Sequence, residues 1–435
     1  MERSDDKDHK LVTVSSSEVG SPIEKDGSIS PFSSREEFIS ENVAPPAPDG
    51  GRRAWLVVLG GWLNFTASFG IVNAFGTFES VYETDLHMST SLVTWIGSAQ
   101  MFVLFVGGII VGPIFDKWGA RIPMLMGTFL CLVSFLSCSF STKFYQLLLA
   151  QGFTLGLGCA LLFYPTTSAV SEWFDKRRGL ALGLVVSGAS AGGILWPLVL
   201  NQLIDKIGIN GTHRATGVIA APLMLTSCFL VKERKLTNSA NDDSEAKVPP
   251  APVQQTSLAA TILDVRFLAL SLGLLFINGG MMVPFFYIPQ YAIDHGVSPT
   301  MANNMLAITY VASLCGRILS GWVADQIGRF NMLICISTLT GIATLCWMQT
   351  STLPAMMTVS LLFGFSSGGI VPLGSACVAQ TTPASMGRIG LRIGAMMAIC
   401  SVGTLASGPI SGTIRDQTHQ WWGVLVSQKR FLSVF

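Results

Sequence analysis

The sequence predicts an all-α polytopic membrane protein, and three observations lead to this fold class. Half of its 435 residues are hydrophobic and only 12% are charged, whereas a soluble domain has about 25% charged residues. The apolar residues come in blocks of about 20, the length of helix that crosses roughly 30 Å of hydrocarbon. Short polar loops separate these blocks. Together these features predict many membrane-spanning helices rather than several soluble domains.

A polar region precedes the first apolar block. Residues 1–50 are rich in Ser, Pro, Asp and Glu and are expected to form a disordered cytoplasmic tail without the apolar core of a signal peptide. Eleven spans are then expected, at residues 54–78, 91–114, 122–141, 146–171, 179–200, 215–231, 267–291, 301–324, 331–350, 354–379 and 391–412.

A long linker divides these spans into two groups. Residues 232–257 are polar and Pro-rich. We therefore expect an N-terminal six-helix bundle over residues 51–231, a cytoplasmic linker over 232–262, and a C-terminal bundle of five spans over 263–412. A short tail over 413–435 follows, whose apolar stretch WWGVLVS is too short to cross a membrane.

Lys and Arg gather in alternate loops, which predicts the orientation. With the N-terminus inside, at least thirteen of these residues lie in expected cytoplasmic segments, whereas the outer loops up to the tenth span carry only Lys143, Lys206 and Arg214. The sequence Asn210-Gly211-Thr212 then faces outward, so Asn210 is a candidate N-glycosylation site and the protein a candidate glycoprotein.

Two charged loops share one pattern. VGPIFDKWGARIPML (111–125) contains Asp116, and LSGWVADQIGRFNML (319–333) contains Asp325, 209 residues further along. Each loop follows the second span of its group. Internal repeats of this kind are typical of secondary transporters, whose two halves move about a site near the membrane midplane.

The first loop resembles the signature G-x-x-x-D-(R/K)-x-G-x-(R/K) of the major facilitator superfamily, and the matching residues are Gly112, Asp116, Lys117, Gly119 and Arg121. The corresponding residues of the second loop are Asp325, Gly328 and Arg329. The resemblance implies two pseudo-symmetric helix bundles, so a twelfth span is missing. It also implies that the loop controls gating, by contacting the ends of neighbouring helices in the inward-closed state. The alternative is that the Lys and Arg of this loop only anchor it on the cytoplasmic side of the membrane.

Two further stretches are similar to the monocarboxylate porter family, PDGGRRAWLVVLGGW (48–62) and WFDKRRGLALGLVVSGASAGG (173–193). Arg317 matches that family's intramembrane arginine in the eighth span. Ser313 stands where animal lactate carriers have an acidic residue, and Asn73 where they have a lysine. These differences favour the fungal-type branch, whose substrates range from organic acids and vitamins to secondary metabolites leaving the cell.

The resemblance implies a secondary active transporter that moves a small organic acid or a secondary metabolite, with export of a biosynthetic product as one direction. The expected partners are an anionic or lipophilic solute, protons and the lipid bilayer. Arg317, Asn73 and Ser313 are the candidate substrate-binding residues. The alternatives are an uptake carrier for a monocarboxylate or vitamin, and a transporter-like sensor or receptor. The expected location is the plasma membrane, with the vacuolar membrane as the alternative.

The depth of Arg317 supports its assignment. It precedes Asp325 by eight residues, which is about 12 Å along a helix and close to the midplane of a core of roughly 30 Å. A charge there is costly and usually functional. A bond to backbone carbonyls or to an acid on another helix is the alternative role.

Other chemistries are not expected. All nine cysteines lie in apolar blocks, and the five histidines lie in tails or loops, so we expect no metal site and no intramembrane histidine. Residues 188–192 match the nucleophile motif G-x-S-x-G, but that motif requires a strand-to-helix turn with His and Asp nearby. No enzymatic activity, cofactor or nucleic-acid partner is predicted.

Overall fold

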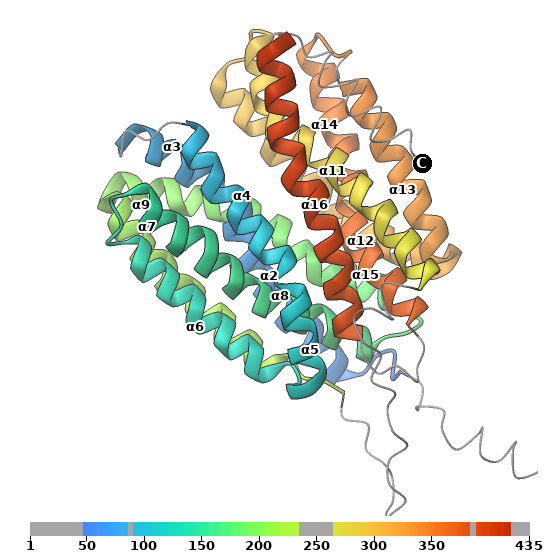
Figure 1. Ribbon diagram of the computed structural model, residues 1–435. Coiled ribbons are helices and arrows are strands. Elements are labelled where there is room, and N and C mark those ends of the chain that lie inside the picture. The colour runs from blue at the N-terminus through green and yellow to red at the C-terminus, as the bar shows by residue number, and fades with distance from the viewer. Residues whose placement is uncertain (1–46, 86–89, 235–263, 348, 383–388, 419–435) are drawn as a thin grey trace, which may run out of the picture. The chain divides into compact units, whose positions relative to one another are not determined.

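The computed structural model describes residues 47–85, 90–234, 264–347, 349–382 and 389–418, and these residues form helices joined by short connections (Figure 1). The prediction of an all-α membrane protein is confirmed, because nine helices in the described part of the chain are long and apolar enough to span a membrane. The expected N-terminal tail, central linker and C-terminal tail lie almost wholly outside the described residues.

The first half of the described chain, residues 47–234, contains eight α-helices and one π-helix, η1. They are α2 (Arg52–Asn73), α3 (Phe75–Asp85), α4 (Thr90–Val106), α5 (Gly108–Trp118), α6 (Arg121–Cys138), α7 (Phe144–Leu147), η1 (Leu148–Leu155), α8 (Gly156–Trp173) and α9 (Arg178–Leu230). Within α9 the chain turns at Gly208, whose φ of 67° is a conformation that glycine adopts without strain. Two expected spans therefore lie on the two sides of Gly208.

The second half, residues 264–418, contains α11 (Val265–Asp294), α12 (Pro299–Ile327), α13 (Arg329–Trp347), α14 (Leu353–Gly368), α15 (Ile370–Thr381) and α16 (Ile389–Thr418). Capping residues fix where two of them begin. The Asp264 carboxylate accepts a hydrogen bond from the Arg266 N–H at the start of α11, and the Ser298 hydroxyl accepts one from the Met301 N–H at the start of α12.

The number of spans stays a prediction. Each expected segment overlaps described helices, although those at 122–141 and 331–350 run past the ends of α6 at Cys138 and α13 at Trp347. The nine candidates count α9 once, and in α16 only Ile389–Leu405 is an apolar helix, shorter than a full span. The division into two bundles of six and five spans is likewise a proposal rather than a finding.

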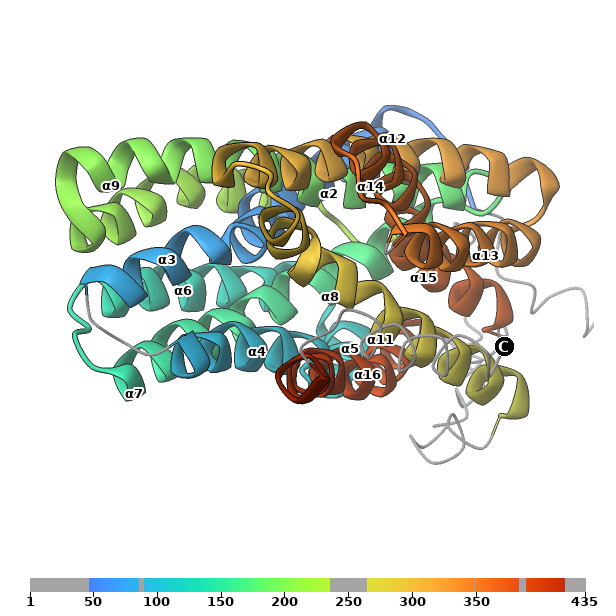
Figure 2. The same cartoon turned by 90° about the horizontal axis from the view of Figure 1, so that it is seen from above.

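Glycines allow helices of the two halves to approach closely at two places, α9 against α12 and α5 against α16, pairs that lie side by side in Figures 1 and 2. A Cβ atom on Gly183 of α9 would collide with the Arg317 carbonyl oxygen of α12. A Cβ on Gly394 of α16 would collide with the Gly108 carbonyl oxygen of α5. Small residues at such crossings let helix backbones pack directly in a membrane.

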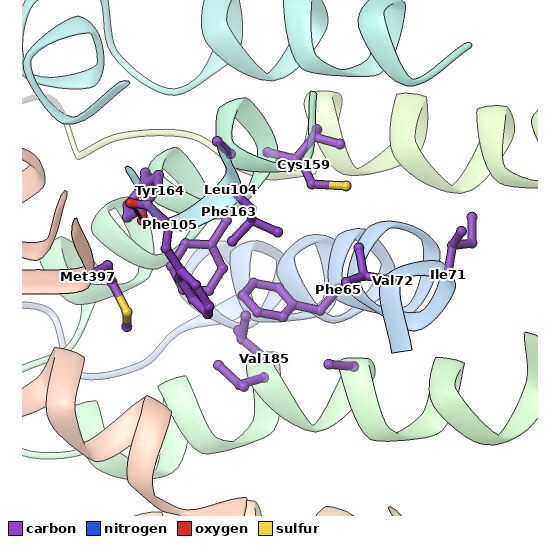
Figure 3. Close-up of a cluster of buried hydrophobic side chains, with 14 of the residues drawn as sticks. Phe65, Ile71, Val72, Leu104, Phe105, Cys159, Phe163, Tyr164, Val185 and Met397 are labelled. Carbon is purple, nitrogen blue, oxygen red and sulfur yellow. Dashed lines mark hydrogen bonds between the residues drawn. The ribbon is translucent and has the colours of Figure 1, made fainter. Parts of the chain in front are cut away.

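A buried aromatic cluster lies next to these crossings (Figure 3). The ring of Phe65 in α2 is 5.3 Å from that of Phe163 in α8, between centroids. The neighbouring Tyr164 hydroxyl donates a 2.8 Å hydrogen bond to the Phe105 carbonyl. Apolar and aromatic packing therefore fixes α2 and α8 behind the surface that α9 presents to α12.

The expectation that every histidine lies in a tail or loop is wrong for His213. Its side chain is 2% exposed within α9; its ring stacks on Phe78 at 4.9 Å and its Nε2 is 3.0 Å from the Tyr82 hydroxyl. The reason is that the helix resumes after Gly208. The sequence predicts that the sixth span begins only at residue 215, whereas residues 209–214 already form a turn of helix that packs against α3.

Candidate functional site

Asp116 lies in the last turn of α5 and contacts the first turn of α16. Its carboxylate accepts hydrogen bonds from the backbone N–H groups of Gly390, at 3.1 Å, and Leu391, at 3.0 Å. The first N–H groups of a helix lack partners within the helix and carry a partial positive charge. A carboxylate therefore satisfies both the hydrogen-bonding and the electrostatic need of this helix end.

Asp325, in the second half, makes the corresponding contact with a helix start of the first half. It lies near the end of α12 and accepts hydrogen bonds from the N–H groups of Gly179 and Leu180, both at 2.8 Å, at the start of α9. The two charged loops that the sequence singled out thus place one carboxylate each on a helix start of the opposite half. The contacts lie at the end of the molecule that is predicted to be cytoplasmic.

The glycines of the two loops end the helices that carry these aspartates. Gly119, with a φ of 74°, follows α5, and Gly328, with a φ of 100°, follows α12. Such positive φ values favour glycine. Gly112 lies one turn before Asp116 and packs against the Gly390 carbonyl, so a side chain there would separate α5 from α16.

The basic residues of the two loops differ in their contacts. Arg329 lies 3.8 Å from Asp325 and 3.8 Å from Asp175 of the first half, and it donates to the Asp175 carbonyl. Arg121 instead lies over the ring of Phe229, at 5.4 Å, and Lys117 over Trp118, at 5.9 Å. Arg329 therefore bridges the halves, whereas Lys117 and Arg121 contact rings of their own half.

Sequence reasoning missed two carboxylates at this end. Asp49, in the stretch PDGG, accepts hydrogen bonds from the N–H groups of Asp175, at 2.6 Å, and Arg177, at 3.3 Å. Asp264 pairs with Arg392, which is 1% exposed in α16. Burial raises the pKa of Asp264, but the Arg392 hydrogen bond and charge outweigh it, so this pKa lies below its ordinary value. An Asp before two glycines was the available signal for Asp49.

Arg317 lies in the interior, between α12 and α9. One terminal guanidinium nitrogen donates a 2.7 Å hydrogen bond to the Val186 carbonyl of α9. Its Nε is buried with no hydrogen-bond partner among the described residues. The backbone contact foreseen as an alternative is therefore present, but it uses only one of the five N–H groups of the side chain.

Asn73 and Ser313 contact different helices. The Asn73 amide, at the end of α2, donates to the Ala189 carbonyl of α9 at 3.1 Å. Ser313 is 1% exposed, and its hydroxyl lies against Gly368 of α14. The structure thus brings Asn73 and Arg317 to α9 and turns Ser313 toward α14. It also places Tyr310, which the sequence did not single out, against Gly193 beside Asn73.

The candidate glycosylation site lies just after the turn at Gly208. Asn210 is exposed. Thr212, the third residue of its motif, is buried, and its hydroxyl donates to the Gly208 carbonyl at 2.7 Å. The Asn210 side chain is therefore accessible, whereas the Thr212 hydroxyl is buried and hydrogen-bonded within the folded protein.

Helices of two halves that meet at their ends, with a charged residue further in, are typical of membrane transporters built from two repeats. The chain belongs to the Major Facilitator Superfamily, whose family model matches residues 57–408. It is therefore a multi-pass membrane protein and a transporter of small molecules.

Named relatives come from fungi. The chain is 43% identical over 383 residues to the MFS-type transporter pynF of Aspergillus niger, covering 87% of this chain and 85% of that protein. It is 35% identical to the aspyridones efflux protein apdF of Emericella nidulans, covering 90% and 78%, and 32% identical to the agnestins efflux protein AgnL12 of Paecilomyces divaricatus, covering 90% and 88%.

Solved structures share the fold. The Escherichia coli fucose:proton symporter FucP matches with a TM-score of 0.67 at 16% identity, covering 88% of this chain and 96% of FucP. The proton:xylose symporter XylE matches with a TM-score of 0.68 at 13% identity, covering 88% and 93%. The predicted major facilitator fold is confirmed by these similarities.

Proposed function

We propose that this transporter exports an acidic secondary metabolite, and that Arg317 binds the acidic group. Two named relatives are efflux proteins for metabolites, the aspyridones and the agnestins. The observation that carries the proposal is the interior position of Arg317. It holds a full positive charge between α9 and α12, and no carboxylate of the described residues forms an ion pair with it.

A bound anion would balance that charge. The hydrogen bond to the Val186 carbonyl orients the guanidinium, but a carbonyl is a neutral partner and leaves the charge uncompensated. Charges at this depth are costly and usually face a partner or a pathway. The planar guanidinium can also hold a carboxylate or enolate with two parallel hydrogen bonds, which a lysine cannot do.

We further propose that Asp116 and Asp325 control gating by holding the cytoplasmic end closed, and that opening of this end requires both carboxylates to leave their helix starts. Asn73, which contacts α9 as Arg317 does, would contribute a polar group nearer the outer end of that helix, whereas Ser313 would act through the packing of α14.

The proposal also includes membership of the fungal-type monocarboxylate porter branch, a location in the plasma membrane and coupling to protons. A receptor without transport and an uptake carrier are its competitors.

Differential metabolite analysis tests the proposal. Cells carrying the wild-type gene, Arg317→Gln or no gene are compared for each metabolite inside and outside the cell. We expect an acidic metabolite to move outward only with the wild-type gene, and Arg317→Gln to resemble the deletion. Arg317→Lys should retain partial export. Arg214→Gln, which changes an arginine near Ser139 and Phe140, is the matched control. Wild-type export by Arg317→Gln would refute the role of Arg317.

A further inference from the structure

Tyr310 and Phe285 place an aromatic surface next to Arg317. The two rings, from α12 and α11, stack with centroids 5.9 Å apart and planes 29° apart. Behind them, Phe285 meets Phe363 of α14 edge-on at 5.2 Å, and Phe363 is 1% exposed. Since Phe363 is fixed in the core, it holds the ring of Phe285, and Phe285 in turn supports that of Tyr310.

This aromatic surface faces the protein interior rather than lipid. Tyr310, Phe285 and Arg317 are all partly exposed. The lipid-facing stripe of α12 contains Val311, Leu319 and Trp322, which are 51%, 47% and 50% exposed. At 3.6 residues per turn, Tyr310 and Arg317 lie on the roughly opposite side of α12. They therefore lie on the side of α12 that packs against α9.

The way α9 pairs with α12 sets the distance between Arg317 and the aromatic surface. Arg317 contacts Val186, and Tyr310 contacts Gly193, so seven residues separate the two contacts on each antiparallel helix. This is about 10 Å along the helix axes. Gly193 has no side chain to cover the Tyr310 ring. An acid the size of lactate cannot reach Arg317 and the rings together, whereas an acid with an attached ring can.

We propose that Tyr310 and Phe285 select a planar conjugated acid, whose ring stacks on them while its acidic group binds Arg317. This selection rests on the proposed function, because it describes the rest of the substrate whose acidic group binds Arg317. Aromatic faces stack favourably on other planar π-systems, and a saturated ring of similar size gains only burial. The substrate class is thus an acid with an aromatic or conjugated ring, in preference to an aliphatic one.

A matched pair of probes tests this selection. Cinnamate and 3-cyclohexylpropanoate have the same number of carbon atoms and the same carboxylate, but only cinnamate is planar and conjugated. Binding of each to the full-length protein in lipid nanodiscs is measured by calorimetry, with empty nanodiscs subtracted. We expect wild-type protein to prefer cinnamate by about threefold to tenfold. Phe285→Leu and Tyr310→Leu should each bring the ratio close to one.

The controls separate selection from folding and from transport itself. Phe285→Tyr keeps a ring and should keep the preference, and Phe129→Leu removes a ring that is 66% exposed on α6 and should leave it unchanged. Equal affinity for the two acids in wild type, or a preference that survives both leucine variants, overturns the selection and leaves the role of Arg317 standing. Binding of both acids that is unaffected by Arg317→Gln overturns the proposed function as well.

Discussion

Two aspartates make the most informative contacts at the residue scale. Asp116 and Asp325 each accept two backbone N–H groups at a helix start of the opposite half. A carboxylate at such a position contributes up to about 2 kcal/mol through charge and hydrogen bonding. Replacing it by a neutral amide keeps the shape and removes the charge.

Asp116→Asn should therefore loosen the contact between α5 and α16. We expect hydrogen–deuterium exchange in residues 389–394 to rise about tenfold, which corresponds to roughly 1.4 kcal/mol, and transport to fall. Arg121→Ala is the matched control, because Arg121 lies over Phe229 rather than at the start of α16. The control should leave exchange at the start of α16 at the wild-type rate. If Asp116→Asn also leaves it unchanged, the aspartate does not hold this end closed.

The charged loops also show which functional residues could be predicted from the sequence and which could not. The repeat identified Asp116 and Asp325, because both occupy one pattern of charged and small residues. It could not identify Asp49, whose partners are backbone N–H groups of a loop 126 and 128 residues away. It also could not show that Ser313 faces α14, since a helical position gives a direction but not the neighbour found there.

At the scale of elements, α9 makes one of the two glycine-lined contacts between the halves. Its glycines pack against α2 through Gly188 and Gly192, and against α12 through Gly179 and Gly183. Apolar blocks predicted where this helix lies in the sequence. They did not predict that it continues through Thr212 and His213, because short polar residues after Gly208 are as typical of a loop as of a helix start.

Gly183→Ala tests the close approach of α9 and α12. The added Cβ would collide with the Arg317 carbonyl oxygen, so the two helices must separate and Arg317 must shift. We expect a lower melting temperature and a loss of transport of about tenfold or more. Gly76→Ala in α3, where nothing lies within 4 Å of the new Cβ, should change neither. Wild-type transport by Gly183→Ala would show that this crossing tolerates a side chain.

At the scale of the whole molecule, the orientation rests on the distribution of Lys and Arg. The first expectation is that Asn210 lies outside and carries a glycan. Because Thr212 is buried in the folded protein, the glycan must be attached before the helix packs. Treatment with an N-glycosidase should increase electrophoretic mobility, and Asn210→Gln should remove that shift. The N-terminal tail has no Asn-x-Ser/Thr motif, so an acceptor site is introduced there as the converse test. Glycosylation of that introduced site would reverse the predicted topology.

We propose that the whole molecule is a carrier of an acidic solute. Flux through purified protein in proteoliposomes tests that claim most directly, with radiolabelled cinnamate loaded inside and its exchange against external cinnamate followed over time. We predict exchange with the wild-type protein, and exchange close to that of empty liposomes for Arg317→Gln, at equal reconstitution. Binding of cinnamate by the wild-type protein without any flux would contradict the account and identify a receptor instead.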